Sequence, residues 1–213
     1  MSYRVKEIFY SLQGEGYYSG RPAVFCRFAG CNLWSGKEAD RQKAVCKFCD
    51  TDFAGIDGTE GGVYENAADL TEKIAQLWPK RNNKFAHPFV VCTGGEPLLQ
   101  LNDELIAALH KKSFEIAVET NGTIEAPKGI DWICVSPKAG AKLVQDCGHE
   151  LKLVYPQPGA EPEEYQGLDF KYFFLQPLDG SGRKETTRKT LEYVLAHPQW
   201  RFGFQLHKIL GIE

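Results

Sequence analysis

The sequence predicts an α/β fold built around a mostly parallel sheet. Short apolar runs of strand length recur along the chain, at 24–28, 89–93, 116–119, 132–135, 151–155 and 172–175. Segments with apolar residues at helical spacing lie between several of these runs, and parallel strands need helix-length connections of this kind. The units are too few for an eight-stranded barrel of about 250 residues, so we expect an incomplete barrel or an open sheet.

Prolines mark where several of these elements begin and end. Pro22 and Pro88 precede the first two strands, while Pro79 and Pro198 follow two helical patterns. The three predicted helices carry their apolar residues at Leu70, Ile74 and Leu77, at Leu101, Leu105 and Leu109, and at Leu191, Val194 and Leu195. The polar segments 35–45 and 57–65 predict exposed loops. The apolar stretch 202–212 predicts a packed C-terminal segment.

Length and composition narrow the class of protein. The chain has 213 residues, so we expect one domain over 1–213 with an insertion at 35–45. A net charge of −3 argues against a protein held to nucleic acid by a basic face. The charged start of the sequence does not resemble a signal peptide, and no segment has the length of a membrane span. These features predict a cytoplasmic protein that binds neither nucleic acid nor membrane.

Four of the seven cysteines lie between positions 26 and 49, which favours metal binding or catalysis over disulfides. Fourteen residues separate Cys31 from Cys46, and Cys49 completes a CxxC pair. With Cys26, four thiolates would form a closed zinc site. Without it, three thiolates would hold an iron–sulfur cluster with one iron open to a ligand. Strand alternation favours the second interpretation, because it directs Cys26 to the core and Arg27 to a charged ligand on the opposite face.

Several motifs together make the sequence similar to a known family. They are Ser-Leu-Gln-Gly-Glu-Gly at 11–16, Phe-Cys-Arg-Phe-Ala-Gly-Cys-Asn-Leu at 25–33, Cys-Lys-Phe-Cys-Asp-Thr at 46–51, Thr-Gly-Gly-Glu-Pro at 93–97, Ser-Pro-Lys at 136–138, Gln-Pro-Leu-Asp at 176–179 and Gln-Leu-His-Lys at 205–208. This pattern resembles the 7-carboxy-7-deazaguanine synthase family of radical S-adenosylmethionine enzymes. The long Cys31 to Cys46 spacing is similar to that of one branch of the family.

The resemblance implies a partial, modified (β/α) barrel of the radical S-adenosylmethionine type that forms a homodimer. It also implies a lyase that converts 6-carboxy-5,6,7,8-tetrahydropterin to 7-carboxy-7-deazaguanine with release of ammonia, a step in queuosine biosynthesis. The implied cofactors are a four-iron four-sulfur cluster, S-adenosylmethionine and Mg²⁺. The implied electron donor is a protein such as a flavodoxin or a ferredoxin.

The resemblance also assigns residues to these ligands. It implies that Cys31, Cys46 and Cys49 bind the cluster and that Thr51 binds Mg²⁺. The residues implied to bind S-adenosylmethionine are Gly95, Ser136, Pro137, Lys138, Gln176, Pro177, Leu178 and Asp179. Those implied to bind the pterin are Leu12, Gln13, Gly14, Arg27, Thr93 and Glu213. The strand-end position of Glu119 and the place of His207 make both candidates for proton transfer, although a structural histidine fits position 207 equally well.

Two other functions fit parts of the same pattern. A different small radical S-adenosylmethionine enzyme, such as a glycyl-radical activase, would share the three cysteines. Its active site would need an opening wide enough to admit a peptide. A binding module stabilised by zinc on Cys26, Cys31, Cys46 and Cys49 would need no open metal position.

Overall fold

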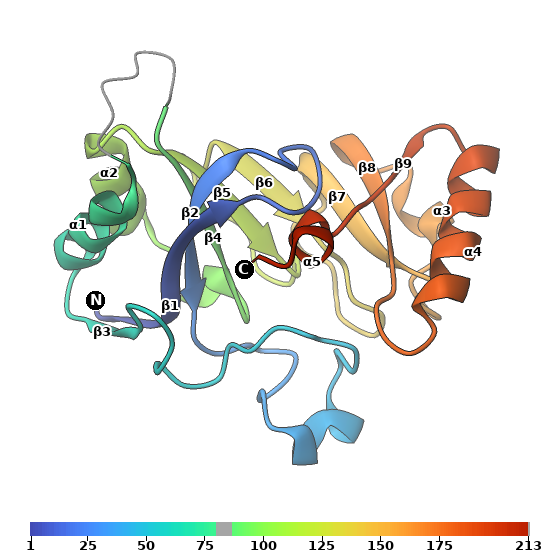
Figure 1. Cartoon of the computed structure of the whole chain (residues 1–213), viewed down its shortest axis with the longest axis horizontal. Helices are drawn as coiled ribbons and strands as arrows, with labels where there is room; N and C mark the ends of the chain where they lie inside the picture. The colour runs from blue at the N-terminus through green and yellow to red at the C-terminus, as the bar shows by residue number, and fades with distance from the viewer. Residues whose placement is uncertain (80–86, 213) are drawn as a thin grey trace.

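The computed structural model describes residues 1–79 and 87–212, and these form a nine-stranded sheet flanked by helices (Figure 1). The strand order is β3-β1-β2-β4-β5-β6-β7-β8-β9. From β2 to β9 every neighbouring pair is parallel, and β1 pairs antiparallel with both β2 and β3. The predicted α/β class with a mostly parallel sheet is confirmed.

All six predicted strands are present. They are β2 (Pro22–Phe28), β4 (Phe89–Gly94), β5 (Glu115–Thr120), β6 (Trp132–Val135), β7 (Cys147–Tyr155) and β8 (Asp169–Pro177). The prediction missed three further strands, β1 (Tyr3–Leu12), β3 (Gly62–Tyr64) and β9 (Trp200–Phe202). The register of β1 against β2 shifts between Val5 and Glu7, and this irregularity breaks the two-residue alternation that marks a strand in sequence.

The three predicted helices are α1 (Ala67–Leu77), α2 (Asp103–Lys111) and α4 (Arg183–Ala196). The side chains of Asn66 and Asn102 accept hydrogen bonds from the backbone N–H groups of Asp69 and Leu105, which fixes where α1 and α2 begin. Shorter helices are η1 (Glu38–Lys43), η2 (Pro97–Leu99), α3 (Pro162–Tyr165) and α5 (Leu206–Leu210). Segments 35–45 and 57–65 are therefore not wholly loop, since they contain η1 and β3.

Each face of the sheet carries its own cluster of apolar side chains. Helices α1 and α2 pack on the outer face, where Val24, Cys26 and Phe28 of β2 lie in one core cluster with Leu70 and Leu105. The inner face carries a second cluster that includes Phe25, Val91 and Trp132. Helix α4 lies at the far end of the sheet, over β8 and β9 (Figure 1). The inner face beyond the second cluster is left for polar side chains, and the site lies there.

The C-terminal segment differs from its prediction. Phe204, Ile209 and Leu210 are 58%, 63% and 53% exposed, so the stretch 202–212 is only partly packed. Polar contacts hold this segment instead: Lys208 of α5 forms ion pairs, the Leu206 N–H donates to the Gly14 carbonyl oxygen, and Gln205, just before α5, donates to Glu15. No helix in the part of the chain that the structure describes is long and apolar enough to cross a membrane.

Candidate active site

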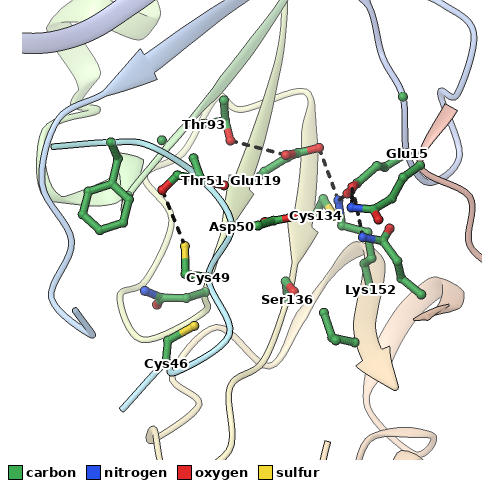
Figure 2. Close-up of a pocket in the computed structure, with 18 of the residues that line it drawn as sticks. Glu15, Cys46, Cys49, Asp50, Thr51, Thr93, Glu119, Cys134, Ser136 and Lys152 are labelled. Atoms are coloured by element: carbon green, nitrogen blue, oxygen red, sulfur yellow. Dashed lines mark hydrogen bonds and ion pairs between the residues drawn. The ribbon is translucent and has the colours of Figure 1, made fainter. Parts of the chain in front are cut away.

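A cavity of about 280 Å³ opens where the parallel strands end (Figure 2). It collects most of the predicted site residues from segments far apart in sequence. Its lining includes Leu12, Gln13, Gly14, Arg27, Cys31, Cys46, Cys49, Thr51, Thr93, Gly95, Glu119, Ser136, Lys138, Gln176, Pro177, Leu178, Asp179 and His207. Pro137 is buried beside it but does not line it, and Glu213 lies outside the described residues. Polar groups at the carboxyl ends of parallel strands are the usual place for ligands in α/β folds.

The three predicted cluster cysteines line the cavity, as does Cys134 of β6, whereas Cys26 is excluded from it. Cys31, Cys46 and Cys49 contribute to the lining, whereas Cys26 is fully buried in the outer core cluster. Arg27, the next residue, lines the cavity, as strand alternation predicts. The alternative with zinc on four cysteines is therefore wrong, because the sheet separates Cys26 from the other three.

Within the CxxC pair, the contact between the two thiols favours the thiolate at Cys49 and the protonated thiol at Cys46. A hydrogen bond from Cys46 lowers the pKa of Cys49 to about 6, although burial opposes this. The thiolate is the form that binds metals. Among the described residues, no group of three or more His, Cys, Asp or Glu side chains is placed to hold a single metal ion. Cys31, Cys46 and Cys49 nevertheless line one cavity, as the thiolate ligands of one iron–sulfur cluster must.

Gly95 is required by the protein's own backbone. A Cβ atom there would lie 2.0 Å from the carbonyl oxygen of Gly30 and 2.9 Å from the Cβ of Cys31. The glycine therefore lets the end of β4 pass directly against the cysteine-bearing loop. Its neighbour Glu96 is buried and accepts hydrogen bonds from the Thr120 hydroxyl and the Asn121 N–H, both at 2.8 Å. Burial raises the pKa of Glu96, and these bonds oppose that rise.

The loop after β1 carries a partly buried carboxylate, Glu15, between two glycines. A Cβ on Gly14 would lie 2.2 Å from Nδ1 of His207, and one on Gly16 would lie 1.8 Å from Oε1 of Glu150. A side chain at either position would require His207 or Glu150 to move, and Gly16 also has a φ of 64°, which favours glycine. The two glycines therefore place Glu15 inside the protein, where Lys152 approaches it.

Lys152 lies between two carboxylates (Figure 2). Its Nζ is 2.5 Å from Oε2 of Glu15 and 3.5 Å from Oε1 of Glu119. Burial alone would raise the pKa of Glu15, but the charge and hydrogen bond of Lys152 lower it to about 2. Burial alone would lower the pKa of Lys152, but Glu119 and Glu15 together raise it well above its usual value. Lys152 therefore stays a cation at neutral pH and Glu15 an anion.

The same carboxylate orients two amides of the cavity wall. Gln176 and Gln205 donate from Nε2 to Oε1 of Glu15, at 3.0 and 3.1 Å. Oε1 of Gln176 is buried and has no hydrogen-bond partner within the described residues. A buried acceptor without a partner is costly, so the arrangement suits a ligand that donates an N–H or O–H group to Gln176.

Glu119 takes part in a second set of contacts. Gln13 donates from Nε2 to its Oε1 at 3.0 Å, and the Thr93 hydroxyl donates to its Oε2 at 3.3 Å. His207 also lines the cavity, next to Gly14. The structure thus brings the two predicted proton-transfer residues to one cavity, together with Gln13 and Thr93.

Arg27 reaches the cavity from β2 with part of its guanidinium unpaired. Its Nε lies 2.7 Å from Oε1 of Glu7, while the two terminal nitrogens have no partner among the described residues. These nitrogens form a planar fork that matches a carboxylate. The arrangement can therefore bind an anionic group of a ligand without losing the pairing that holds the side chain.

Ser136, Lys138 and Asp179, three of the residues predicted to bind S-adenosylmethionine, line the same cavity. Lys138 donates from Nζ to the backbone oxygen and the hydroxyl of Ser136, at 2.6 and 2.7 Å, and burial lowers the pKa of Lys138. Nζ of Lys208 lies 2.6 Å from both Asp50 and Asp179. This lysine connects the segment after Cys49 to the end of β8.

Sequence reasoning missed Glu15, Lys152, Gln205 and Lys208 as functional candidates. Lys152 carried a usable signal, because it lies within the apolar run 151–155 as Arg27 lies within 24–28. A charged residue in such a strand must find a partner when the strand is buried. Glu15 and Gln205 lie in the motifs at 11–16 and 205–208, but only their pairing in three dimensions indicates what they do.

Comparisons with known proteins place the chain in a family. No protein-family model matches it. It is 62% identical over 213 residues to the 7-carboxy-7-deazaguanine synthase of Bradyrhizobium diazoefficiens and 58% identical over 212 residues to that of Caulobacter vibrioides, with each pair of chains covered completely. A crystal structure of QueE from Escherichia coli matches with a TM-score of 0.74 at 26% identity, covering 97% of this chain and 95% of that one. With such identity over full-length relatives, the chain belongs to the 7-carboxy-7-deazaguanine synthase family.

Proposed function

We propose that this protein converts 6-carboxy-5,6,7,8-tetrahydropterin to 7-carboxy-7-deazaguanine and releases ammonia. One observation carries the proposal: the three predicted cluster cysteines line the same cavity as the Arg27 guanidinium, whose terminal nitrogens are free, and the Glu119 carboxylate. The thiols suit a redox cofactor, and the other groups suit a small anionic heterocycle. The cavity volume of about 280 Å³ is near the lower end of small-molecule sites and disfavours a peptide substrate such as a glycyl-radical enzyme.

Cys31, Cys46 and Cys49 would hold the four-iron four-sulfur cluster, leaving one iron without a protein ligand. When bound, the cluster and S-adenosylmethionine supply hydrogen-atom abstraction from carbon, which no side chain of the protein can perform. Gly95, Ser136, Pro137, Lys138, Gln176, Pro177, Leu178 and Asp179 would hold S-adenosylmethionine. The unpartnered Oε1 of Gln176 supports this, because it offers an acceptor to a ligand N–H or O–H.

Arg27 would bind the carboxylate of the pterin through its two free guanidinium nitrogens. Leu12, Gln13, Gly14 and Thr93 would contact the heterocycle, with Glu213 as a further contact from the C-terminus. Glu119 already accepts hydrogen bonds from Gln13 and Thr93, so its carboxylate is fixed where it can accept from ring N–H groups.

Loss of ammonia requires a proton at the departing nitrogen. Lys152 is a poor donor, because its neighbours raise its pKa well above the usual value. Glu119 and His207, which also line the cavity, are our candidates for this donor. Lys152 would instead hold Glu15 and Glu119 in place as a permanent cation.

Thr51 would supply one hydroxyl ligand to Mg²⁺. One hydroxyl cannot hold the ion, and the described residues contain no ready cluster of carboxylates. Substrate oxygens and water would complete the octahedron, as Mg²⁺ commonly requires. The ion would then act as a template that orients the pterin.

Two partners complete the proposal. The exposed side chains of Phe204, Ile209 and Leu210 support a homodimer, because apolar residues gathered on one segment favour a protein contact. A flavodoxin-like or ferredoxin-like protein would deliver the electron to the cluster.

The test is anaerobic turnover of reconstituted protein with the carboxylated pterin, S-adenosylmethionine, Mg²⁺ and a chemical reductant. We expect the deazaguanine and ammonia to appear in equal amounts. Protein that cleaves S-adenosylmethionine but leaves the pterin unchanged would refute the assignment. Arg27→Met is the matched variant: it should lose pterin turnover while still binding S-adenosylmethionine.

A further inference from the structure

The insertion between the first two cluster cysteines folds around one arginine. Arg41 lies in the short helix η1, and its Nη1 donates to the backbone oxygens of Lys47 and Cys49 at 3.1 and 3.0 Å. Both oxygens belong to the turn that carries Cys46 and Cys49. Residues of the insertion thus reach the ligand-bearing turn through its backbone.

The guanidinium of Arg41 is itself held from two sides. Its Nε lies 2.8 Å from both carboxylate oxygens of Glu38, and its plane lies over the Trp34 ring at 4.0 Å. Trp34 is buried and packs edge-on against Phe53 at 5.5 Å. Only a planar group with several fixed donors can make these contacts together, so lysine cannot replace arginine here.

This arrangement differs from an ordinary surface ion pair. The Glu38 side chain is 77% exposed, and its pairing alone would contribute little. The Arg41 side chain is only 27% exposed, and its two backbone contacts go to the cysteine turn. The backbone contacts of Arg41 therefore restrict the conformation of the cysteine turn, whereas its ion pair with Glu38 adds little to the stability of the protein.

We propose that Arg41 is a positioning residue that holds the turn from Cys46 to Cys49 in the conformation that binds the cluster. The 14 residues between Cys31 and Cys46 then have a physical role, because they include the arginine that holds the turn with the other two metal ligands. The inference rests on the proposed function in one respect, which is that Cys31, Cys46 and Cys49 bind an iron–sulfur cluster. A turn fixed before the metal arrives gives up less conformational entropy on binding.

The test compares iron retention in anaerobically reconstituted protein without S-adenosylmethionine or pterin. We would measure iron per chain and the rate of iron loss to a ferrous chelator for wild type, Arg41→Met and Arg41→Lys. Arg188→Met is the matched control, because Arg188 also pairs with carboxylates but lies on α4. We expect iron loss about tenfold faster in both Arg41 variants, as for loss of one charged hydrogen bond, and no change in the control.

Urea unfolding of the apo proteins separates positioning from general stability. Arg41→Met should unfold at the wild-type urea concentration, since the insertion lies outside the core. Wild-type rates of iron loss in Arg41→Met would overturn the proposal, and so would a matching drop in apo stability. The iron assay needs no pterin, so a failure of turnover and a failure of the Arg41 assignment are separate results.

Discussion

Replacing Lys152 by methionine should destabilise the protein strongly at neutral pH. Met fills a similar volume but removes the cation that Glu15 and Glu119 share. Glu15 would remain buried with an unbalanced charge, or would take up a proton at a cost. Breaking a buried ion pair by removing one partner typically costs about 3–5 kcal/mol.

The pKa of Glu15 gives a second measure of the same effect. It lies at about 2 in the folded protein, against 4.5 for an ordinary glutamate. The difference of about 2.5, at about 1.4 kcal/mol for each pH unit, corresponds to roughly 3 kcal/mol. Because the folded value is the lower one, this stabilisation is complete above about pH 4.5 and is lost as the pH falls toward 2.

Urea unfolding of the apo protein at pH 7.5, followed by tryptophan fluorescence, measures the loss. With a dependence of about 2 kcal/mol per molar urea, the midpoint should fall by roughly 1.5 M. Lys189→Met is the matched control, because Lys189 pairs with Glu185 at 3.7 Å on an exposed helix and should matter little. The double variant Lys152→Met with Glu15→Gln should recover part of the loss, since the buried charge goes with its partner. A Lys152→Met midpoint equal to that of wild type would refute the reasoning.

Three further substitutions test separate parts of the site. Arg27→Lys should raise the KM for the pterin at least about tenfold, because lysine keeps the charge but loses the planar fork. The affinity for S-adenosylmethionine, measured by dialysis, should not change. Equal effects on the two ligands would contradict this prediction. Lys208→Met should weaken S-adenosylmethionine binding about fivefold by releasing Asp50 and Asp179 from their shared cation, and unchanged equilibrium dialysis would argue against that coupling. The Cys26→Ala variant should keep its full iron content, and its free energy of unfolding should fall by about 1 kcal/mol, as expected for a buried core residue. Loss of iron from this variant would show that Cys26 is a ligand.

Sequence patterns located six of the seven strands that form parallel pairs, because these six carry continuous apolar runs, and missed the three-residue β9. The run 132–135 coincides with β6, and 151–155 falls inside β7. Strand β1 escaped detection because Lys6 is buried there by ion pairs to Asp52 and Asp57 rather than by apolar contacts. A charged residue that is buried through distant partners cannot be identified from neighbouring residues alone.

The candidate site was predictable where residues follow a strand, as Thr93 and Ser136 do, since strand ends meet at one edge of the sheet. The motif resemblance supplied residues that no local pattern marks, such as Thr51. Neither route found the pair of Glu15 and Lys152, which lies 137 positions apart in the chain. The glycines around Glu15 were visible, but the groups that make them necessary, His207 and Glu150, come from other parts of the fold.

The hydrogen bond between Glu15 and Gln205 also has a consequence for synthesis of the protein. The two residues are 190 positions apart, and at about 5–20 residues per second a ribosome needs roughly 10 to 40 seconds to travel from one codon to the other. Cys31, Cys46 and Cys49 are translated early in that interval, before the wall that faces them has been made. These three thiols therefore wait for most of the time of synthesis before the cavity that they line can be completed.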